Sequence, residues 1–239
     1  MNRPINMKTI GILGGMSNQA TASYYKMIND EVNKVYGNWD IAETIIQGVN
    51  FGNIEYFVRN NKWDEAQLYL RNKAILTQKG GADLLICVSN TMHKVLEDIS
   101  NSIEIPFIHI VDPTAEAIID SGLSKVGLLG TKATMEADFI KNRYKNNYGI
   151  DIITPKEDLQ ILIDKIIFDE LVKGKILESS RKKYIEICQD LKNKGAEGII
   201  LGCTEIFLLL RQLDTPDIPL FNTTELHVKA AVKMALNHK

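Results

Sequence analysis

The chain has 239 residues, of which 45% are hydrophobic and 24% charged, and its formal net charge is -2 at pH 7. This balance of 28 basic and 30 acidic residues is typical of a soluble globular protein and argues against nucleic acid as a partner. No apolar run reaches the roughly 18 residues that span a bilayer, and no signal-peptide pattern precedes the first apolar run. We therefore expect no membrane partner and a cytoplasmic location. The 3 cysteines show neither CxxC nor paired spacing, which fits a reducing compartment and predicts no disulfide framework and no metal site.

Strand and helix signals alternate along the first 110 residues. Short apolar runs predict strands at 9–13, 41–49, 84–88 and 105–110. Amphipathic stretches predict helices at 17–35, 64–79 and 90–99. The first of these helices should bury one face, formed by Tyr24, Tyr25, Ile28, Val32 and Val35. Gly14-Gly15 predicts a tight turn after the first strand rather than a dinucleotide-binding loop, because the spacing is not GxGxxG.

The rest of the chain continues the alternation. Strands are predicted at 125–129, 151–154, 198–201 and 219–221. Helices are predicted at 135–148, 159–172, 179–194, 205–213 and 225–236. The regular alternation indicates parallel sheets covered by helices. We expect the closing helix to pack back on the first half of the protein.

Three motifs occur twice, in the same order. The matched residues are Gly11 with Gly127, Ser89 with Cys203, and Pro106 with Pro219, at offsets of 116, 114 and 113 residues (127 − 11, 203 − 89 and 219 − 106). The sequence therefore predicts an α/β fold of two pseudo-symmetric Rossmann-like halves, each a mostly parallel sheet flanked by helices. We expect 1–112 with 222–239 to form the first half and 113–221 the second, with a site in the cleft between them.

Ligands of open parallel sheets bind beyond the carboxyl ends of the strands. Segments 14–17, 89–91, 130–134 and 203–205 lie there and carry small or hydroxyl residues, which suit an anion such as a carboxylate. The candidate substrate contacts in or beside these segments are Met16, Ser17, Asn90, Thr91, His93, Thr131, Thr134, Thr204 and Glu205. His93 could orient the site, contact the substrate or only pack. Glu205 could be a site carboxylate or a favourable charge in the first turn of a helix.

Cys203 is the strongest candidate for a reactive group. A thiol at the start of a helix can have its pKa lowered from about 8.5 to about 7 or below, which would make it a base or nucleophile near neutral pH. The alternative is a buried structural cysteine. We interpret Cys87, inside its predicted strand, and Cys188, in the middle of a predicted helix, as core residues.

Three segments resemble the signature motifs of the aspartate/glutamate racemase family. They are Gly14-Gly15-Met16-Ser17, Asn90-Thr91-Met92-His93 and Gly202-Cys203-Thr204-Glu205. The likeness includes segment 166–171 and runs essentially end to end, and it is strongest to the amino-acid racemases that carry Asn-Thr-Met-His. The resemblance implies a fold of two facing α/β halves and an isomerase that racemises an amino acid without a cofactor. It also implies a homodimer as the usual assembly.

The resemblance implies two proton-transfer residues on opposite faces of the substrate Cα. By that likeness Cys203 is one of them. The opposing residue of the family is usually Cys and in some members Thr, and here it is Ser89. Because a serine hydroxyl is a far weaker acid than a thiol, we expect unequal behaviour toward the two enantiomers.

The basic residues that often hold an acidic side chain in this family are not matched in this chain. One family position falls at Leu162, with Lys165 one turn later, and the other falls in 54–57. Because an unpaired buried carboxylate is costly, Lys165, Arg59 or Lys132 would have to serve for aspartate or glutamate. A neutral polar amino acid is an open alternative.

Two other functions stay open. A decarboxylase of the same superfamily needs only one cysteine to protonate its carbanion, so Cys203 alone would suffice. A non-catalytic amino-acid-binding relative is the second alternative.

Overall fold

A computed structural model describes residues 5–236, apart from the side chain of residue 97. Residues 1–4 and 237–239 of the expected first half lie outside the described residues. The described chain forms two compact units. Unit 1 contains 5–88, 95–109 and 227–236, and unit 2 contains 89–94 and 110–226. The main difference from the expected halves is at 89–94, which was expected in the first half and lies in unit 2. Side chains of this segment bond to other residues of unit 2.

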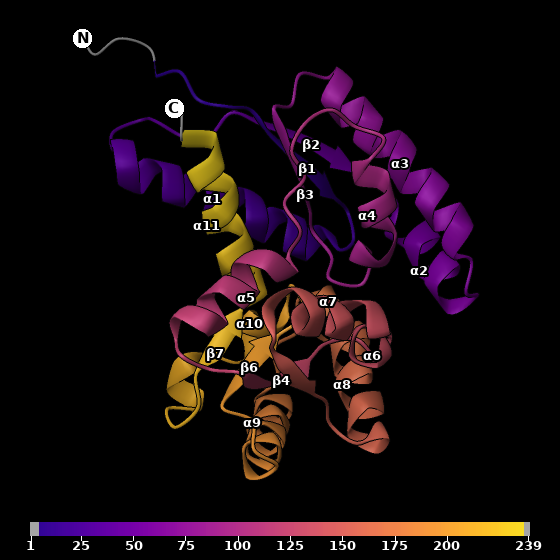
Figure 1. Ribbon diagram of the computed structural model, residues 1–239, viewed down its shortest axis with the longest axis vertical. Helices are drawn as coiled ribbons and strands as arrows, with labels where there is room; N and C mark the ends of the chain where they lie inside the picture. Colours follow the sequence, from indigo (N-terminus) through magenta and orange to yellow (C-terminus); the bar gives the residue numbers. More distant parts are fainter. Residues whose placement is uncertain (1–4, 237–239) are drawn as a thin grey trace. The chain divides into compact units, whose positions relative to one another are not determined.

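Unit 1 is built on a parallel sheet of three strands in the order β2-β1-β3 (Figure 1). The strands are β1 (Ile10–Gly14), β2 (Thr44–Gly48) and β3 (Leu84–Cys87). The helices before and after them are α1 (Asn18–Tyr36), α2 (Phe51–Arg59), α3 (Trp63–Lys79) and α4 (His93–Ser100). One face of the sheet, with Ile12 and Ile86, packs against α1 and the closing helix α11 (Thr223–Leu236). On the other face, a Cβ added at Gly11 would lie 2.7 Å from Thr77 of α3, so the absence of a side chain lets this helix approach closely.

Unit 2 is built on a parallel sheet of four strands in the order β5-β4-β6-β7. The strands are β4 (Lys125–Leu129), β5 (Asp151–Ile153), β6 (Gly198–Leu201) and β7 (Leu220–Asn222). The helices are α5 (Val111–Asp120), α6 (Lys132–Glu136), α7 (Asp138–Tyr148), α8 (Glu157–Asp169), α9 (Glu178–Asn193), α10 (Ile206–Leu209) and the start of α11, with 3-10 turns at Leu171–Lys173 and Gln212–Asp214.

Side chains of β6 alternate between two cores, so both faces of this sheet are covered. Ile199 and Leu201 join the core with α8 and α9, whereas Ile200 joins the core with α5 and α7. This alternation is the pattern of a buried parallel strand. The predicted class, α/β with two parallel sheets flanked by helices, is confirmed.

The strand register repeats the offsets found in the sequence. In unit 1, β1 residue Gly11 pairs with Leu85, which forms an isolated bridge with Phe107. In unit 2, Gly127 pairs with Ile199, which pairs with Leu220. Corresponding partners are again 116, 114 and 113 residues apart (127 − 11, 199 − 85 and 220 − 107). Ser89 and Cys203 therefore follow equivalent strands, β3 and β6.

Several predicted elements are corrected by the structure. Helices α2 and α5 were not predicted, and the strand expected at 105–110 is reduced to the single bridge at Phe107. The helix expected at 135–148 is divided into α6 and α7, because Ala137 between them has extended backbone angles. The helix expected at 205–213 is the four-residue α10 followed by a 3-10 turn.

Helix α1 buries a narrower face than expected. Ala20, Tyr24, Ile28 and Val32 are buried at i, i+4 spacing, whereas Tyr25 is 41% and Val35 63% exposed. The prediction for Tyr25 and Val35 was wrong, because among the buried residues of α1 the core of unit 1 takes in only Ala20, Tyr24, Ile28 and Val32. The prediction that the closing helix packs on the first half is confirmed, since its apolar residues from Val228 onward share the core of unit 1.

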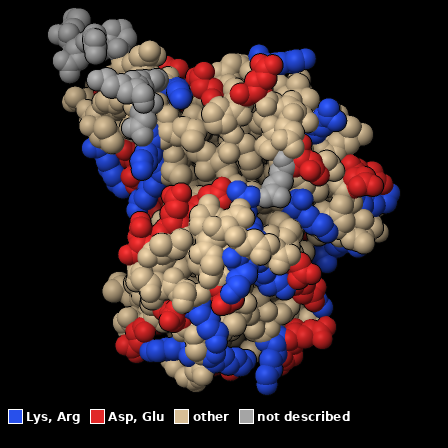
Figure 2. Space-filling model, viewed as in Figure 1, with Lys and Arg blue, Asp and Glu red and all other residues tan. Residues whose placement is uncertain are grey.

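Charged side chains of both signs are spread over the face of the molecule that Figure 2 shows, in keeping with the 28 basic and 30 acidic residues of the chain. No helix within residues 5–236 has the length and apolar composition needed to cross a bilayer.

Gly15, in the turn after β1, cannot be replaced without strain. Its φ is +89°, and a Cβ added there would lie 2.3 Å from the carbonyl oxygen of Val49. We expect Gly15→Ala to lower the free energy of unfolding by about 1–3 kcal/mol or more, measured by urea denaturation. The matched control is Gly48→Ala, because a Cβ at Gly48 meets no described atom within 4 Å. Equal stability of the two variants would contradict this prediction.

Candidate active site

Cys203 lies two residues after the end of β6, which is one of the two inner strands of its sheet. The preceding Gly202 donates its N–H to the carbonyl of Leu129 at 2.6 Å, which continues the pairing of β6 with β4. The thiol is nearly buried, with the residue 8% exposed. Its Sγ lies 3.2 Å from the Glu205 carboxylate, to which it donates a hydrogen bond. Thr204 donates its hydroxyl to the same carboxylate oxygen at 2.8 Å.

The expected low pKa of Cys203 is wrong. Burial raises the pKa of this thiol well above its ordinary value, and the negative charge of Glu205 raises it further. No long helix offsets these effects, because α10 begins only at Ile206 and has four residues. The resting thiol therefore holds its proton, and Glu205 is positioned to receive it.

Glu205→Gln is expected to move the titration of the Cys203 thiol to lower pH. The carboxylate charge raises the thiol pKa, so a neutral amide in its place lowers it. The rate of alkylation by iodoacetamide, followed against pH at Cys203 by peptide mass spectrometry, reports the thiolate. Glu136→Gln removes an exposed carboxylate paired with Lys132 and should leave the titration unchanged. A thiolate that forms at the same or higher pH in Glu205→Gln would refute the assigned cause.

Ser89 lies in a tight turn between β3 and α4, and its side chain is half-buried. Its hydroxyl oxygen accepts the backbone N–H of Met92 at 3.3 Å. His93 Nδ1 lies 2.7 Å from the carbonyl oxygen of Ser89, and its Nε2 accepts the N–H of Ile110 at 3.2 Å. Since a carbonyl only accepts, Nδ1 carries the proton and the buried ring is neutral. His93 thus bonds the backbone of Ser89 with one ring nitrogen and that of Ile110 with the other, which favours the orienting role over direct contact with a substrate.

Three threonine hydroxyls meet in unit 2. Thr91 lies 3.1 Å from Thr131 and 2.9 Å from Thr134, and the latter two hydroxyls are 3.0 Å apart. Thr131 also caps α6 by accepting the N–H of Thr134. The structure therefore brings together three of the predicted substrate contacts from segments about 40 residues apart. Hydroxyl donors gathered at a strand end suit a carboxylate.

Asn90 reaches a residue that the sequence did not single out. Its side-chain amide donates to Thr223 Oγ1 at 3.2 Å, and Thr223 donates to the carbonyl of Leu201 at 2.8 Å. Thr223 follows β7 directly, so the rule that ligands bind beyond strand ends could have pointed to it. The repeat did not, because its matched motifs stop before this residue.

Met16 and Ser17 belong to unit 1, in the turn between β1 and α1. Both are buried, and Ser17 caps α1 by accepting the N–H of Ala20 at 3.2 Å. Their contact with a substrate stays a prediction.

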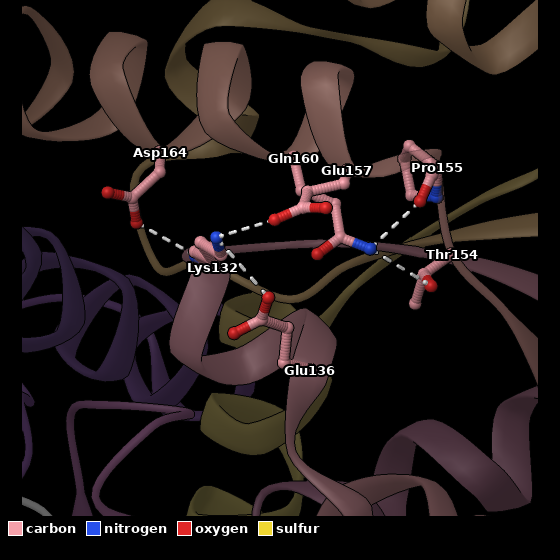
Figure 3. A network of polar contacts seen from close by, with 7 residues as sticks. All are labelled: Lys132, Glu136, Thr154, Pro155, Glu157, Gln160 and Asp164. Atoms are coloured by element: carbon pink, nitrogen blue, oxygen red, sulfur yellow. Dashed lines mark hydrogen bonds and ion pairs between the residues drawn. The ribbon is translucent and has the colours of Figure 1, made fainter.

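Lys165 is not brought to the other predicted residues. Helix α8 turns Ile163, Ile166 and Ile167 inward, and the helical phase leaves Lys165 exposed on the opposite side. The neighbouring Asp164 instead contacts the start of α6, where it accepts the backbone N–H of Lys132 at 2.8 Å (Figure 3).

The other two cations are engaged with carboxylates. Figure 3 shows the Lys132 ammonium between Glu136 and Glu157. Its Nζ lies 3.5 Å from the Glu136 carboxylate and 3.4 Å from that of Glu157. Hydrogen bonding to Glu157 and the charge of Glu136 raise the pKa of Lys132. Arg59 pairs with Glu55 on α2 at 2.7 Å. Neither cation is held ready for a substrate carboxylate.

The two remaining cysteines have the features of core residues. Cys87 and Cys188 are fully or almost fully buried, and burial raises the pKa of Cys188 to about 12. A thiol with that pKa is unreactive at neutral pH. Within the described part of the chain, no group of three or more His, Cys, Asp or Glu side chains could hold a metal ion.

The fold and the site together define a class: a repeated α/β protein with a thiol and a hydroxyl at equivalent strand ends. The family described as Asp/Glu/Hydantoin racemase matches residues 13–231. The chain therefore belongs to the Asp/Glu/Hydantoin racemase family, and the resemblance seen in its motifs is confirmed. The prediction of an isomerase of this family is confirmed as well.

Individual relatives agree with the family assignment. The broad specificity amino-acid racemase RacX of Bacillus subtilis is 24% identical over 231 residues, covering 96% of this chain and 99% of that protein. A Yersinia pestis protein described as a candidate Asp/Glu racemase has a crystal structure with a TM-score of 0.89, 40% identity and coverage of 97% and 100% of the two chains. The structure of an aspartate racemase homologue from Pyrococcus horikoshii OT3 gives a TM-score of 0.83, 31% identity and coverage of 95% and 99%.

Proposed function

We propose that this protein is a cofactor-independent amino-acid racemase in which Cys203 and Ser89 exchange the Cα proton on opposite faces of the substrate. The observation that carries the proposal is the placement of one thiol and one hydroxyl after equivalent strands of a repeated fold. Membership of a racemase family supports it. Inversion needs two proton-transfer groups within hydrogen-bond reach of one carbon. The repeat supports the proposal because it supplies a thiol and a hydroxyl after equivalent strands.

Abstraction by Cys203 takes two proton movements. The S–H bond breaks and the proton passes to the Glu205 carboxylate, 3.2 Å away. The thiolate then takes the Cα proton, so that the S–H bond re-forms and a carbanion remains on the substrate. A nearby carboxylate is a suitable base for a thiol whose pKa is raised by burial.

Ser89 delivers a proton to the other face of the carbanion. The Met92 N–H that bonds its oxygen stabilises the negative charge that develops as the hydroxyl gives up its proton. The reverse abstraction by Ser89 is harder. Among the described hydrogen bonds, the Ser89 hydroxyl contacts the Met92 N–H and no carboxylate, whereas the Cys203 thiol contacts Glu205. We therefore infer that the enantiomer deprotonated by Cys203 exchanges its proton faster than it inverts.

The remaining substrate contacts are assigned by chemistry. The hydroxyls of Thr91, Thr131 and Thr134 would hold the α-carboxylate, with Met16, Ser17, Asn90 and Thr204 as further wall or anchoring residues. Because Lys132 and Arg59 are paired with carboxylates and Lys165 is exposed, we infer a neutral polar amino acid as the preferred substrate.

We further infer that the enzyme acts as a cytoplasmic homodimer, as its resemblance implies. Its cysteines are free and buried, in keeping with a reducing compartment. Light scattering coupled to gel filtration measures the assembly, and a monomer would refute the dimer.

The deciding experiment is proton NMR of L- and D-amino acids in D2O with the wild-type protein. Loss of a Cα–H signal identifies the substrate, and chiral chromatography of the same samples measures inversion. The presence of only one of two possible cysteines favours one competing function, a decarboxylase. Release of CO2 from a substituted malonate, without Cα–H exchange in any amino acid, would establish that function instead.

A further inference from the structure

Thr223 connects the two segments that carry the proposed proton-transfer groups. Its hydroxyl has a single proton, which it donates to the carbonyl oxygen of Leu201 at 2.8 Å. It therefore accepts, through its oxygen, the hydrogen bond from the Asn90 side chain at 3.2 Å. Asn90 directly follows Ser89, and Leu201 lies two residues before Cys203. All of these residues belong to unit 2.

The surroundings make this link rigid. Thr223 is 0% exposed and Asn90 is buried. Strand pairing of Leu201 with Asn222 holds Thr223 beside the end of β6. Buried hydrogen bonds without competing water keep their geometry, and losing one leaves its partners unsatisfied.

We propose that Thr223 is a positioning residue that sets the separation of Ser89 and Cys203. This inference rests on the proposed racemase function and adds a residue that touches neither reacting group. Inversion requires both groups to stay within reach of one carbon, whereas exchange of the Cα proton on one face requires only Cys203. A displacement of about 1 Å can lower a rate about 100-fold, so the link acts on inversion more than on exchange.

Thr224 provides a matched control from the next position of the same helix. It is also 0% exposed, but its hydroxyl has no hydrogen-bond partner among the described residues. Valine has nearly the same shape as threonine, so either replacement removes one hydroxyl from an equally buried position. Only Thr223→Val breaks the link between the two segments.

The test compares inversion with one-sided exchange in Thr223→Val, Thr223→Ser and Thr224→Val. We expect Thr223→Val to lower the ratio of inversion to Cα–H exchange by about 10-fold to 100-fold. Thr223→Ser, which keeps the hydroxyl, should restore most of the ratio, and Thr224→Val should match the wild type. If the wild type racemises its substrate and the two valine variants have equal ratios, the inference about Thr223 is overturned and the proposed function stands.

Hydrogen–deuterium exchange followed by mass spectrometry provides a readout that needs no substrate. Thr223→Val should speed backbone exchange in both 89–94 and 201–204, whereas Thr224→Val should change neither. If Thr223→Val left the backbone exchange rate of either segment unchanged, Thr223 would not link the two segments. If the wild type exchanges no amino acid, the proposed function fails, and this measurement still decides whether Thr223 joins the two segments.

Discussion

Cys203→Ala is expected to reduce Cα–H exchange of the substrate by about 10²–10⁴-fold, the range that a positioned general base contributes. Of the two side chains that donate to Glu205 among the described hydrogen bonds, the Cys203 thiol is much the stronger acid, since Thr204 has a weakly acidic hydroxyl. The loss should appear in kcat with a smaller change in KM, because alanine leaves the threonine group intact. The measurement is the initial rate of Cα–H loss in D2O for each enantiomer.

Cys188→Ala is the matched control for that experiment. Cys188 lies in the same core as Cys203 and is also buried, but it is in the middle of α9 and its thiol pKa is about 12. Its variant should lose some stability, as is usual for a shortened core side chain, and keep its exchange rate. If exchange survived in Cys203→Ala and disappeared in Cys188→Ala, Cys203 would not be the base.

Changes at Ser89 are expected to separate inversion from exchange. Ser89→Ala should lower inversion by about 10²-fold or more, because no hydroxyl then delivers a proton to the far face. Exchange of the enantiomer that Cys203 deprotonates should fall only a few-fold, since its thiol and Glu205 are untouched. Ser89→Cys should speed inversion above the wild type, since a thiol with an ordinary pKa of about 8.5 is a much stronger acid than a hydroxyl.

Ser102→Ala is a suitable control, because Ser102 lies in the loop after α4 rather than in the turn between β3 and α4. It should leave both rates unchanged. Equal loss of exchange and inversion in Ser89→Ala would show that Ser89 binds or positions the substrate rather than delivering a proton. Inversion that persists in Ser89→Ala at the wild-type rate would exclude Ser89 from the reaction.

The raised pKa of Cys203 changes how the site works. A thiolate prepared in advance would make the enzyme active as soon as substrate binds. In the proposed mechanism, a protonated thiol bonded to Glu205 instead makes each abstraction depend on proton transfer between two neighbouring side chains. In that mechanism, the carboxylate whose charge raises the thiol pKa is also the group that takes the thiol proton.

Much of the fold was predictable because its signals are local. Short apolar strands and the amphipathic helices between them leave a period that can be read in any window of the chain. The repeated motifs at Ser89 and Cys203 identified equivalent strand ends before any coordinates, and the strand register has the same offsets. Helices α2 and α5 escaped prediction for a local reason also. The first contains Gly52 and a cluster of aromatic residues, and the second carries Pro113 in its first turn, where proline is tolerated.

The sequence by itself determined the repeat, the α/β class, the family and the residues at the strand ends. Tertiary structure alone decided the surroundings in which those residues lie. The neutral state of His93, the protonated state of Cys203 and the outward direction of Lys165 depend on burial, partners and helical phase. The bond from Asn90 to Thr223 joins residues 133 positions apart, and no local period encodes such a contact. Strand ends can be located from short-range patterns, whereas proton positions and links between segments are set by atoms that only folding brings together.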